Sequence, residues 1–187
     1  MEEYVVLVDT SDNQLGTMEK FKAHVDGRLH RAFSILLYDD HGRMLITQRA
    51  GRKYHSSGLW TNACCSHQRS GESTQQAADR RLREELGITT DLTSLFFFHY
   101  RAELNNGLIE HELDHVLAGV YNQEIEPNDK EVQDWRYVDY AKLLLDLNEN
   151  ADRYTHWFKL ICGKEYRDRI APSVIQELVI QRRAPIH

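Results

Sequence analysis

The chain has 187 residues, of which 41% are hydrophobic and 28% charged, and its formal net charge is −6. This length suits one domain with a core and a pocket beside it, so we expect a single domain over residues 1–187. The negative charge argues against nucleic acid and anionic membranes as partners, so a local cluster of cations must bind any anionic ligand.

The N-terminus and the cysteines indicate a cytoplasmic protein. Residues Met1–Tyr4 are acidic and no apolar stretch approaches membrane-spanning length, so we expect neither a signal peptide nor a membrane span. The chain has 3 cysteines, and a bridge between the adjacent Cys64 and Cys65 would be strained. The reducing cytosol is the compartment that fits this cysteine content.

The first part of the chain is expected to form strands. Tyr4–Asp9 is β-branched and apolar, which predicts a strand that ends in the turn-forming residues 9–13. The runs Ala32–Asp39 and Arg43–Arg49 are separated by Asp40-His41-Gly42 and predict a hairpin. Lys20–His30 is polar and basic, and residues 49–57 are expected to form a basic loop.

A helix is predicted over Ser73–Leu86. Ser73 and Gln76 form a capping-box pattern, Leu82 and Leu86 recur at helical spacing, and Gly87 is a natural stop.

The second half of the chain predicts long strands followed by helices. Leu95–Leu104 and Leu108–Tyr121 are joined by the turn signal Asn105-Asn106-Gly107, and Val132–Val138 adds a strand. After Asp139 the pattern changes, and helices are predicted over Leu143–Leu147, Tyr154–Cys162 and Pro172–Arg182. The expected fold class is α/β (α+β), a mixed sheet with one internal helix and a helical C-terminal part.

Reactive side chains concentrate between Trp60 and Gly87. The segment Trp60–His67 contains a thiol and an imidazole, and the run Arg80–Gly87 contains several carboxylates. This run resembles the Nudix signature, which places carboxylates on a divalent metal bound to a diphosphate. Seven of the nine defining positions match, namely Glu72, Arg80, Leu82, Glu84, Glu85, Gly87 and Ile88.

Two positions depart from that signature. Ser66 replaces the opening glycine, and Arg81 replaces the first catalytic glutamate. A guanidinium in that place removes a metal ligand and repels the ion, which disfavours hydrolysis. Glu85, one turn further on the same helix face, could still bind one Mg²⁺ while Arg81 faces phosphate oxygens. An ordinary surface helix with charge pairs is the alternative interpretation of this run.

Three further segments are similar to type I isopentenyl diphosphate isomerases of the Nudix superfamily. They are Arg28–Ser34, Leu59–His67 and Glu110–Glu112, and the resemblance extends from about Lys20 to Trp157. It implies a Nudix-type mixed β-sheet sandwich with helices, an extra N-terminal strand and C-terminal helices. It also implies an enzyme that converts isopentenyl diphosphate to dimethylallyl diphosphate.

The resemblance implies a metal site with three imidazoles and two carboxylates. The matching residues are His24, His30, His67, Glu110 and Glu112. Glu110 and Glu112 are two apart on a predicted strand, so both side chains leave the same face, while His111 and His115 point the other way. Three nitrogens with two carboxylates suit Mn²⁺, Zn²⁺ or Mg²⁺. A second ion, Mg²⁺ bound to the diphosphate, would be held by Glu85.

The reaction implied is a 1,3-allylic proton shift. An alkene carbon carries no acidic proton, so C4 is protonated first to give a tertiary carbocation and C2 then loses a proton. By resemblance, Glu112 with Tyr100 acts at one carbon and Cys65 at the other, with Cys64 facing the core. A buried apolar residue is the more common role of a single cysteine.

The remaining implied contacts are with the substrate. Trp157 matches an aromatic residue that covers the carbocation, although packing of a helix on the sheet would also explain it. Lys20, Arg49, Lys53 and Arg81 match contacts to the diphosphate. The expected partner is a small prenyl diphosphate, bound by a monomer or weak homodimer. A Nudix diphosphate hydrolase and a non-catalytic diphosphate-binding module that contains a metal are the alternatives.

Overall fold

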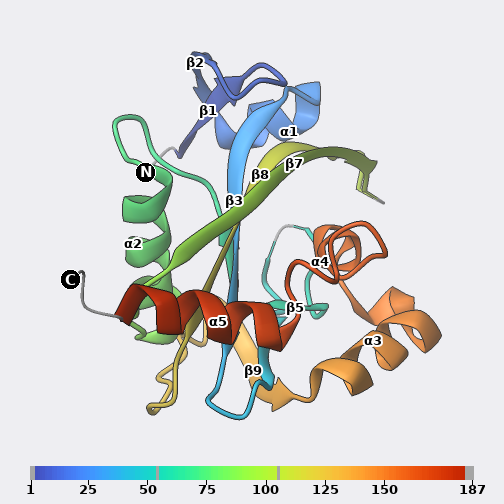
Figure 1. Ribbon diagram of the computed structural model, residues 1–187. Coiled ribbons are helices and arrows are strands. Elements are labelled where there is room, and N and C mark those ends of the chain that lie inside the picture. The colour runs from blue at the N-terminus through green and yellow to red at the C-terminus, as the bar shows by residue number, and fades with distance from the viewer. Residues whose placement is uncertain (1–2, 54, 105, 184–187) are drawn as a thin grey trace.

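The computed structural model of the chain describes residues 3–53, 55–104 and 106–183, and these form a nine-stranded mixed sheet with helices on both faces (Figure 1). Helix α2 (Thr74–Leu86) covers one face, and the C-terminal helices lie on the other side of the sheet. These are α3 (Tyr140–Glu149), α4 (His156–Ile161) and α5 (Pro172–Arg183). The expected mixed sheet with helices is confirmed.

Strand β3 (His30–Tyr38) is the central strand. Strand β8 (Ile109–Val120) pairs with it in parallel over its whole length. The other edge of β3 pairs with three antiparallel strands in turn, namely β1 (Tyr4–Val8), β6 (Cys64–Ser66) and β4 (Met44–Arg49). The expected β3–β4 hairpin is present but pairs only at Leu37 and Tyr38, because β6 pairs with the middle of β3.

Both faces of β3 are buried, which explains its nearly continuous apolar sequence. Phe33, Ile35 and Leu37 belong to the core on the α2 side, while Leu36 and Tyr38 belong to the core beneath the C-terminal helices. Successive side chains of a strand point to opposite faces, so these two cores follow from the alternation along one strand.

Helix α2 is capped at both ends by residues next to it in the sequence. The Ser73 side chain accepts a hydrogen bond from the backbone N–H of Gln76, and the Gln76 side chain accepts one from the backbone N–H of Ser73. Gly87 ends the helix in the left-handed conformation, with φ 68°. Glu72 receives two hydrogen bonds from the Arg80 guanidinium at 2.8 and 2.9 Å, which ties the loop before the helix to its middle.

Strand β7 (Thr93–Glu103) and β8 form the expected long hairpin. At its tip the backbone N–H of Gly107 donates to the Leu104 carbonyl at 3.0 Å, while Asn105 lies outside the described residues. The register places Tyr100 directly opposite Glu112. Two further strands, β5 (Trp60–Asn62) and β9 (Val132–Val138), pair with opposite edges of β4.

The N-terminal region contains more regular structure than the sequence patterns predicted. Strand β2 (Gln14–Glu19) pairs with β1, and the polar run after it forms helix α1 (Lys20–Asp26). The Glu19 carboxylate accepts hydrogen bonds from the first helical N–H groups, and Gly27 ends the helix with φ 61°. Gly27 is a standard helix stop, but glutamate is not among the residues preferred at an N-cap, and the polar interior lacks a strong apolar period.

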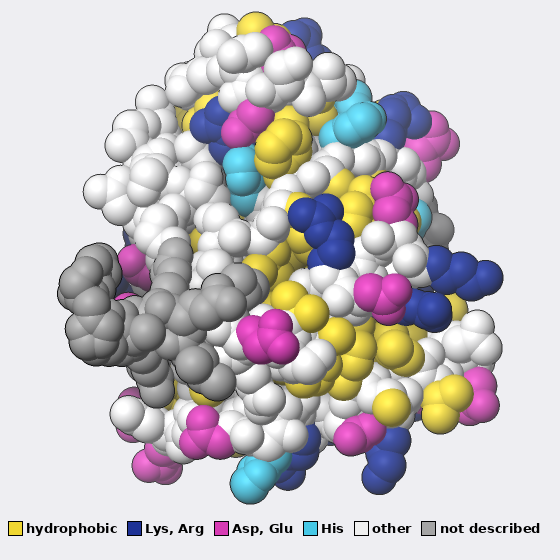
Figure 2. All heavy atoms as spheres, in the orientation of Figure 1, with side chains coloured by type: hydrophobic (Ala, Val, Ile, Leu, Met, Phe, Trp, Pro, Cys, Tyr) yellow, Lys and Arg dark blue, Asp and Glu magenta, His cyan; other side chains and the backbone are white. Residues whose placement is uncertain are grey.

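The C-terminal part is helical, as expected, although the boundaries differ. Helix α3 is longer at both ends than predicted, and α4 begins at His156 because Tyr154 forms a bridge with Trp60 of β5. The Tyr38 hydroxyl donates to the Ile170 carbonyl at 2.5 Å and anchors the segment before α5. In the same orientation, Figure 2 shows hydrophobic side chains gathered beside α5, with charged side chains around them. Within the described residues, no helix is long and apolar enough to cross a membrane.

Candidate active site

A pocket opens over β3, β6 and β8. Its walls contain most of the residues singled out in the sequence, namely Lys20, Arg49, Lys53, Cys65, His67, Arg81, Glu110, Glu112 and Trp157, together with Ala32, Phe33, Ser34, His55 and Ser66. The other predicted residues lie directly behind these walls: His24 and His30 contact His67, Tyr100 contacts Glu112, and Glu85 pairs with Arg81.

The strand order explains why Cys65 and Glu112 share one pocket. Cys65 on β6 pairs with Ser34 on one edge of β3, and Glu112 on β8 pairs with His30 on the other edge. Glu112 and Asp114 leave the same face of β8, because they are two residues apart. The thiol and the carboxylate therefore approach the pocket from opposite edges of the central strand.

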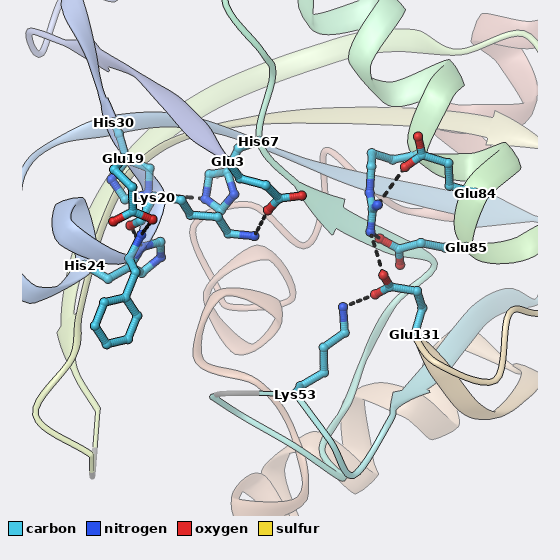
Figure 3. Close-up of polar contacts among 12 residues, drawn as sticks. Glu3, Glu19, Lys20, His24, His30, Lys53, His67, Glu84, Glu85 and Glu131 are labelled. Carbon is cyan, nitrogen blue, oxygen red and sulfur yellow. Dashed lines mark hydrogen bonds and ion pairs between the residues drawn. The ribbon is translucent and has the colours of Figure 1, made fainter. Parts of the chain in front are cut away.

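Four of the five predicted metal ligands converge. His24, His30, His67 and Glu112 each offer one ligand atom, and these atoms lie within 4.8 Å of one another. His67 Nε2 lies 2.8 Å from Glu112 Oε1 and 3.2 Å from His30 Nε2. Figure 3 shows His24, His30 and His67 grouped beneath the N-terminal strands. Cis ligands of one ion are about 3 Å apart at bonds of ~2.1 Å, so this set fits a divalent ion.

Backbone carbonyls orient two of these imidazoles. His24 Nδ1 donates to the Lys20 carbonyl at 2.7 Å, and His30 Nδ1 donates to the Arg28 carbonyl at 2.8 Å. With a proton on Nδ1, each neutral ring presents its lone pair at Nε2. Hydrogen bonds of this kind fix the tautomer of metal-binding histidines.

The ionisation of the cluster also suits a cation. Burial lowers the pKa of His67 to about 3, so its imidazole is neutral at physiological pH. Burial raises the pKa of Glu112, but hydrogen bonds from His30 and His67 outweigh this effect and hold the pKa well below its usual value. His67 therefore presents a neutral nitrogen and Glu112 an ionised carboxylate, which are the forms that bind metal.

Glu110 does not join the group of four, although the sequence interpretation placed it there. It converges instead with His24 and His55 in an adjoining group, where its Oε1 lies 3.3 Å from His55 Nδ1. Because His24 Nδ1 is bonded to a carbonyl, only Nε2 can coordinate, and one nitrogen binds one ion. The two groups share His24, so they can hold only one ion at this residue.

Tyr100 connects the two carboxylates of β8. Its hydroxyl lies 2.7 Å from Glu112 Oε2 and 3.1 Å from Glu110 Oε2, and it can donate to either. Burial and the two carboxylates raise the pKa of Tyr100 well above its usual value. Burial and the charge of Glu112 likewise raise the pKa of Glu110. Tyr100 therefore keeps its proton within reach of Glu112.

The two adjacent cysteines face opposite directions, as expected. Cys64 is 1% exposed and packs in the core against α2, whereas Cys65 is only partly buried and lines the pocket. Cys65 Sγ donates to Asn62 Oδ1 at 2.9 Å and accepts from Trp157 Nε1 at 2.9 Å. Burial, and then the charge of Asp114, raise the pKa of Cys65 to about 12, so it rests as a neutral thiol.

Trp157 closes the pocket on the side of the C-terminal helices. It is 4% exposed, and the Arg49 guanidinium lies 5.3 Å from the centre of its ring. Arg49 also donates from Nη2 to the His55 carbonyl at 3.3 Å. The indole thus lies between the thiol and one of the predicted diphosphate contacts.

Carboxylates pair with three of the four predicted diphosphate contacts. Lys20 Nζ lies 2.9 Å from Glu3 Oε2, Lys53 pairs with Glu131, and Arg81 pairs with Glu85. Figure 3 shows Lys20 facing Glu3 and Lys53 facing Glu131. All four cations line the pocket, so this acidic protein has a local concentration of positive charge that can bind an anion.

Glu85 occupies the place that the helix periodicity predicted. It is 7% exposed and forms an ion pair with Arg81, one turn away on the same face of α2. Among the residues that the structure describes, Glu85 belongs to neither of the two groups of converging metal ligands. A Mg²⁺ at Glu85 would therefore depend on oxygens from a bound diphosphate.

Sequence reasoning missed several residues of the site. His55 was included only in a basic loop, Asp114 follows the predicted carboxylates at the same two-residue spacing, and Glu131 precedes β9. Asp114 accepts a hydrogen bond from Ser34 at 2.8 Å, and Ser34 Oγ lies 3.5 Å from Cys65 Sγ. Strand alternation could have indicated Asp114, but the places of His55 and Glu131 depend on folding of distant segments.

The sequence is similar to known proteins over most of its length. The family model of the NUDIX domain matches residues 28–158. Isopentenyl-diphosphate Delta-isomerase 1 of Aromatoleum aromaticum is 47% identical over 91% of this chain and 100% of its own. The isopentenyl-diphosphate Delta-isomerase of Photobacterium profundum is 51% identical over 84% of this chain and 91% of its own.

Solved structures support the fold independently. A protein of Deinococcus radiodurans is 18% identical and superimposes with a TM-score of 0.66, covering 79% of this chain and 90% of its own. The MutT protein of Methanosarcina mazei is 14% identical, with a TM-score of 0.59, and the alignment covers 83% of this chain and 96% of that protein. At these identities the similarity concerns the fold alone.

Proposed function

The chain belongs to the Nudix family and, within it, to the isopentenyl-diphosphate Delta-isomerases, and from this we propose how its own residues convert isopentenyl diphosphate to dimethylallyl diphosphate. Cys65 is one proton carrier, and Glu112 with Tyr100 is the other. The observation that carries this proposal is their placement on strands that flank β3 from opposite edges, both in one pocket.

The resting protonation states of these groups are complementary. Cys65 is a neutral thiol that can donate a proton, and Glu112 is a carboxylate that can accept one, with the Tyr100 hydroxyl at 2.7 Å. In the opposite direction of the reaction the two roles reverse. The Trp157 ring beside Cys65 offers its π face to a tertiary carbocation and adds no nucleophile to the pocket.

The metal assignment rests on the converging ligands. His24, His30, His67 and Glu112 would hold the ion, and Glu110 would complete the set by turning from His55. When bound, a divalent ion would keep Glu112 ionised and fix its orientation. The three nitrogens favour Mn²⁺ or Zn²⁺ over Mg²⁺.

The diphosphate end of the substrate is assigned to Lys20, Arg49, Lys53 and Arg81. Glu85 would hold a Mg²⁺ that neutralises charge on the diphosphate. Hydrolysis is disfavoured, because Arg81 replaces the first catalytic carboxylate of the Nudix signature and pairs with Glu85. We further place this enzyme in the cytoplasm, as one domain over residues 1–187 that acts as a monomer or weak homodimer.

One experiment distinguishes isomerisation from hydrolysis and from binding without turnover. The purified protein is incubated with isopentenyl diphosphate and Mg²⁺ in deuterated water, and the products are followed by NMR. Deuterated dimethylallyl diphosphate without phosphate release supports the two proton carriers. Release of phosphate or pyrophosphate would mean that hydrolysis persists despite Arg81, and bound substrate without turnover would indicate a binding module.

A further inference from the structure

The carboxylate of Glu131 lies between two cations of the pocket. Its Oε2 pairs with the Lys53 ammonium, and its Oε1 lies 3.5 Å from Nη2 of Arg81. Figure 3 shows Glu131 facing Lys53, with Glu85 close to it on the side of helix α2. One carboxylate therefore bridges two side chains that come from different parts of the chain.

The backbone around Glu131 joins the same two parts. Asn128 donates from its backbone N–H to the Glu85 carbonyl at 2.9 Å, which attaches the segment to the end of α2. Ala50 donates from its backbone N–H to the Glu131 carbonyl at 3.0 Å, which attaches it to the loop that carries Lys53. The segment 128–131 thus links the helix of Arg81 to the loop of Lys53.

We propose that Glu131 is a positioning residue, which sets the separation of Lys53 and Arg81 so that both contact the diphosphate of the substrate. This inference rests on the assignment of those two cations to the diphosphate. Two neighbouring cations on long side chains repel each other and lose rotamer freedom when a ligand orders them. A shared carboxylate offsets the repulsion and orders both side chains before the ligand arrives.

Both cations keep hydrogen-bonding capacity for a ligand while they contact Glu131. An ammonium has three N–H donors and a guanidinium has five. In the described part of the chain, Arg81 Nε is buried and has no hydrogen-bond partner. Lys53 and Arg81 both line the pocket, so a phosphate oxygen can reach them there without displacing Glu131, which distinguishes a positioning carboxylate from a competitor for the site.

The test compares Glu131→Ala and Glu131→Gln with Asp129→Asn, which changes an exposed carboxylate of the same segment. The Michaelis constant and kcat for isopentenyl diphosphate are measured, as is binding of pyrophosphate with Mg²⁺ by calorimetry. We expect Glu131→Ala to raise KM and the pyrophosphate Kd about tenfold with kcat within about twofold, because uniform binding is lost. Glu131→Gln should raise KM and the pyrophosphate Kd by a smaller factor, since it keeps a polar contact with Lys53. Asp129→Asn should have the same KM and Kd as the parent protein.

Tighter pyrophosphate binding in Glu131→Ala would overturn the proposal, because Glu131 would then be a competitor. A fall in kcat at unchanged KM would overturn it too. If Glu131 acts through Lys53, Glu131→Ala has a smaller effect in a Lys53→Ala background, and full additivity contradicts the mechanism.

The single variants Lys53→Ala and Arg81→Ala test separately whether these two cations bind the diphosphate. Unchanged pyrophosphate binding in both would show that the diphosphate contacts themselves are wrongly assigned. Weaker binding in both, with no effect of Glu131→Ala, would refute only the positioning role. Thermal unfolding confirms that each variant is folded, and a lower melting temperature without a change in KM would indicate a merely structural role.

Discussion

The indole Nε1 of Trp157 donates a hydrogen bond to Sγ of Cys65 at 2.9 Å. This bond joins α4 to β6, 92 positions apart in the chain, and fixes the N–H edge of the indole at the thiol. The thiol and the ring that would cover the cation therefore form one unit. Neither residue reaches this arrangement through local structure.

Replacement of Trp157 separates the contribution of its aromatic ring from that of its hydrogen bond to Cys65. Trp157→Phe keeps a smaller π face but loses the N–H donor, and we expect kcat to fall about tenfold, whereas Trp157→Ala should lower it about 100-fold or more. Steady-state kinetics by NMR provide the measurement. Equal activity of Trp157→Phe and the parent would show that the bond to Cys65 is dispensable.

The adjacent cysteines provide a matched pair of variants. Cys65→Ala removes a proton carrier and should lower kcat by roughly 10²–10⁴-fold. Cys64→Ala removes a sulfur from the core against α2, so it should lower stability by about 1 kcal/mol and leave most of the activity. Turnover and urea unfolding are measured for both. Similar losses of activity in two folded variants would contradict the assignment of Cys65.

Removal of one metal ligand should weaken the metal centre. His67→Ala is expected to reduce affinity for Mn²⁺ by at least about 10–100-fold, as measured by competition with a chelator. His111→Ala is the control, because His111 lies beside the ligands on β8 but bonds to the Gly27 carbonyl instead. Metal content that is equal in both variants would place the ion elsewhere.

Chelation of the metal should also change stability. An ion that binds only the folded chain stabilises it by an amount that grows with the logarithm of its concentration relative to Kd, about 2.7 kcal/mol at 100 times Kd. We therefore expect a chelator to lower the melting temperature and added Mn²⁺ to restore it. A melting temperature that does not respond to either treatment would argue against a bound ion.

The pair Glu72–Arg80 predicts a pH dependence of stability. Hydrogen bonds from Arg80 hold the pKa of Glu72 below its usual value. A lowered carboxylate pKa contributes stability above the unfolded-state pKa, and this contribution is lost as the pH falls through the folded-state pKa. Glu72→Gln should therefore cost about 1 kcal/mol at pH 7 and less at pH 3, as measured by urea unfolding. Glu126→Gln, an exposed carboxylate, serves as the control.

Local sequence signals determined several elements correctly. The capping box at Ser73 and the stop at Gly87 define α2, and the turn at Gly107 defines the β7–β8 hairpin. Both depend on interactions between residues near in sequence, which a pattern can reveal. Strand periodicity likewise placed Glu110 and Glu112 on one face, since the alternation is a property of the strand itself.

The tertiary structure decided how those residues combine. His24 lies on a helix that its polar sequence did not predict, and Glu110 converges with His24 and His55 rather than with His30, His67 and Glu112. Glu131 meets Lys53 only because segments far apart in sequence pack together. Pairing across strands and contacts between loops depend on the closure of long chain segments, and no short pattern encodes their geometry. The sequence by itself determined the chemical groups and their family, while folding alone determined which groups touch.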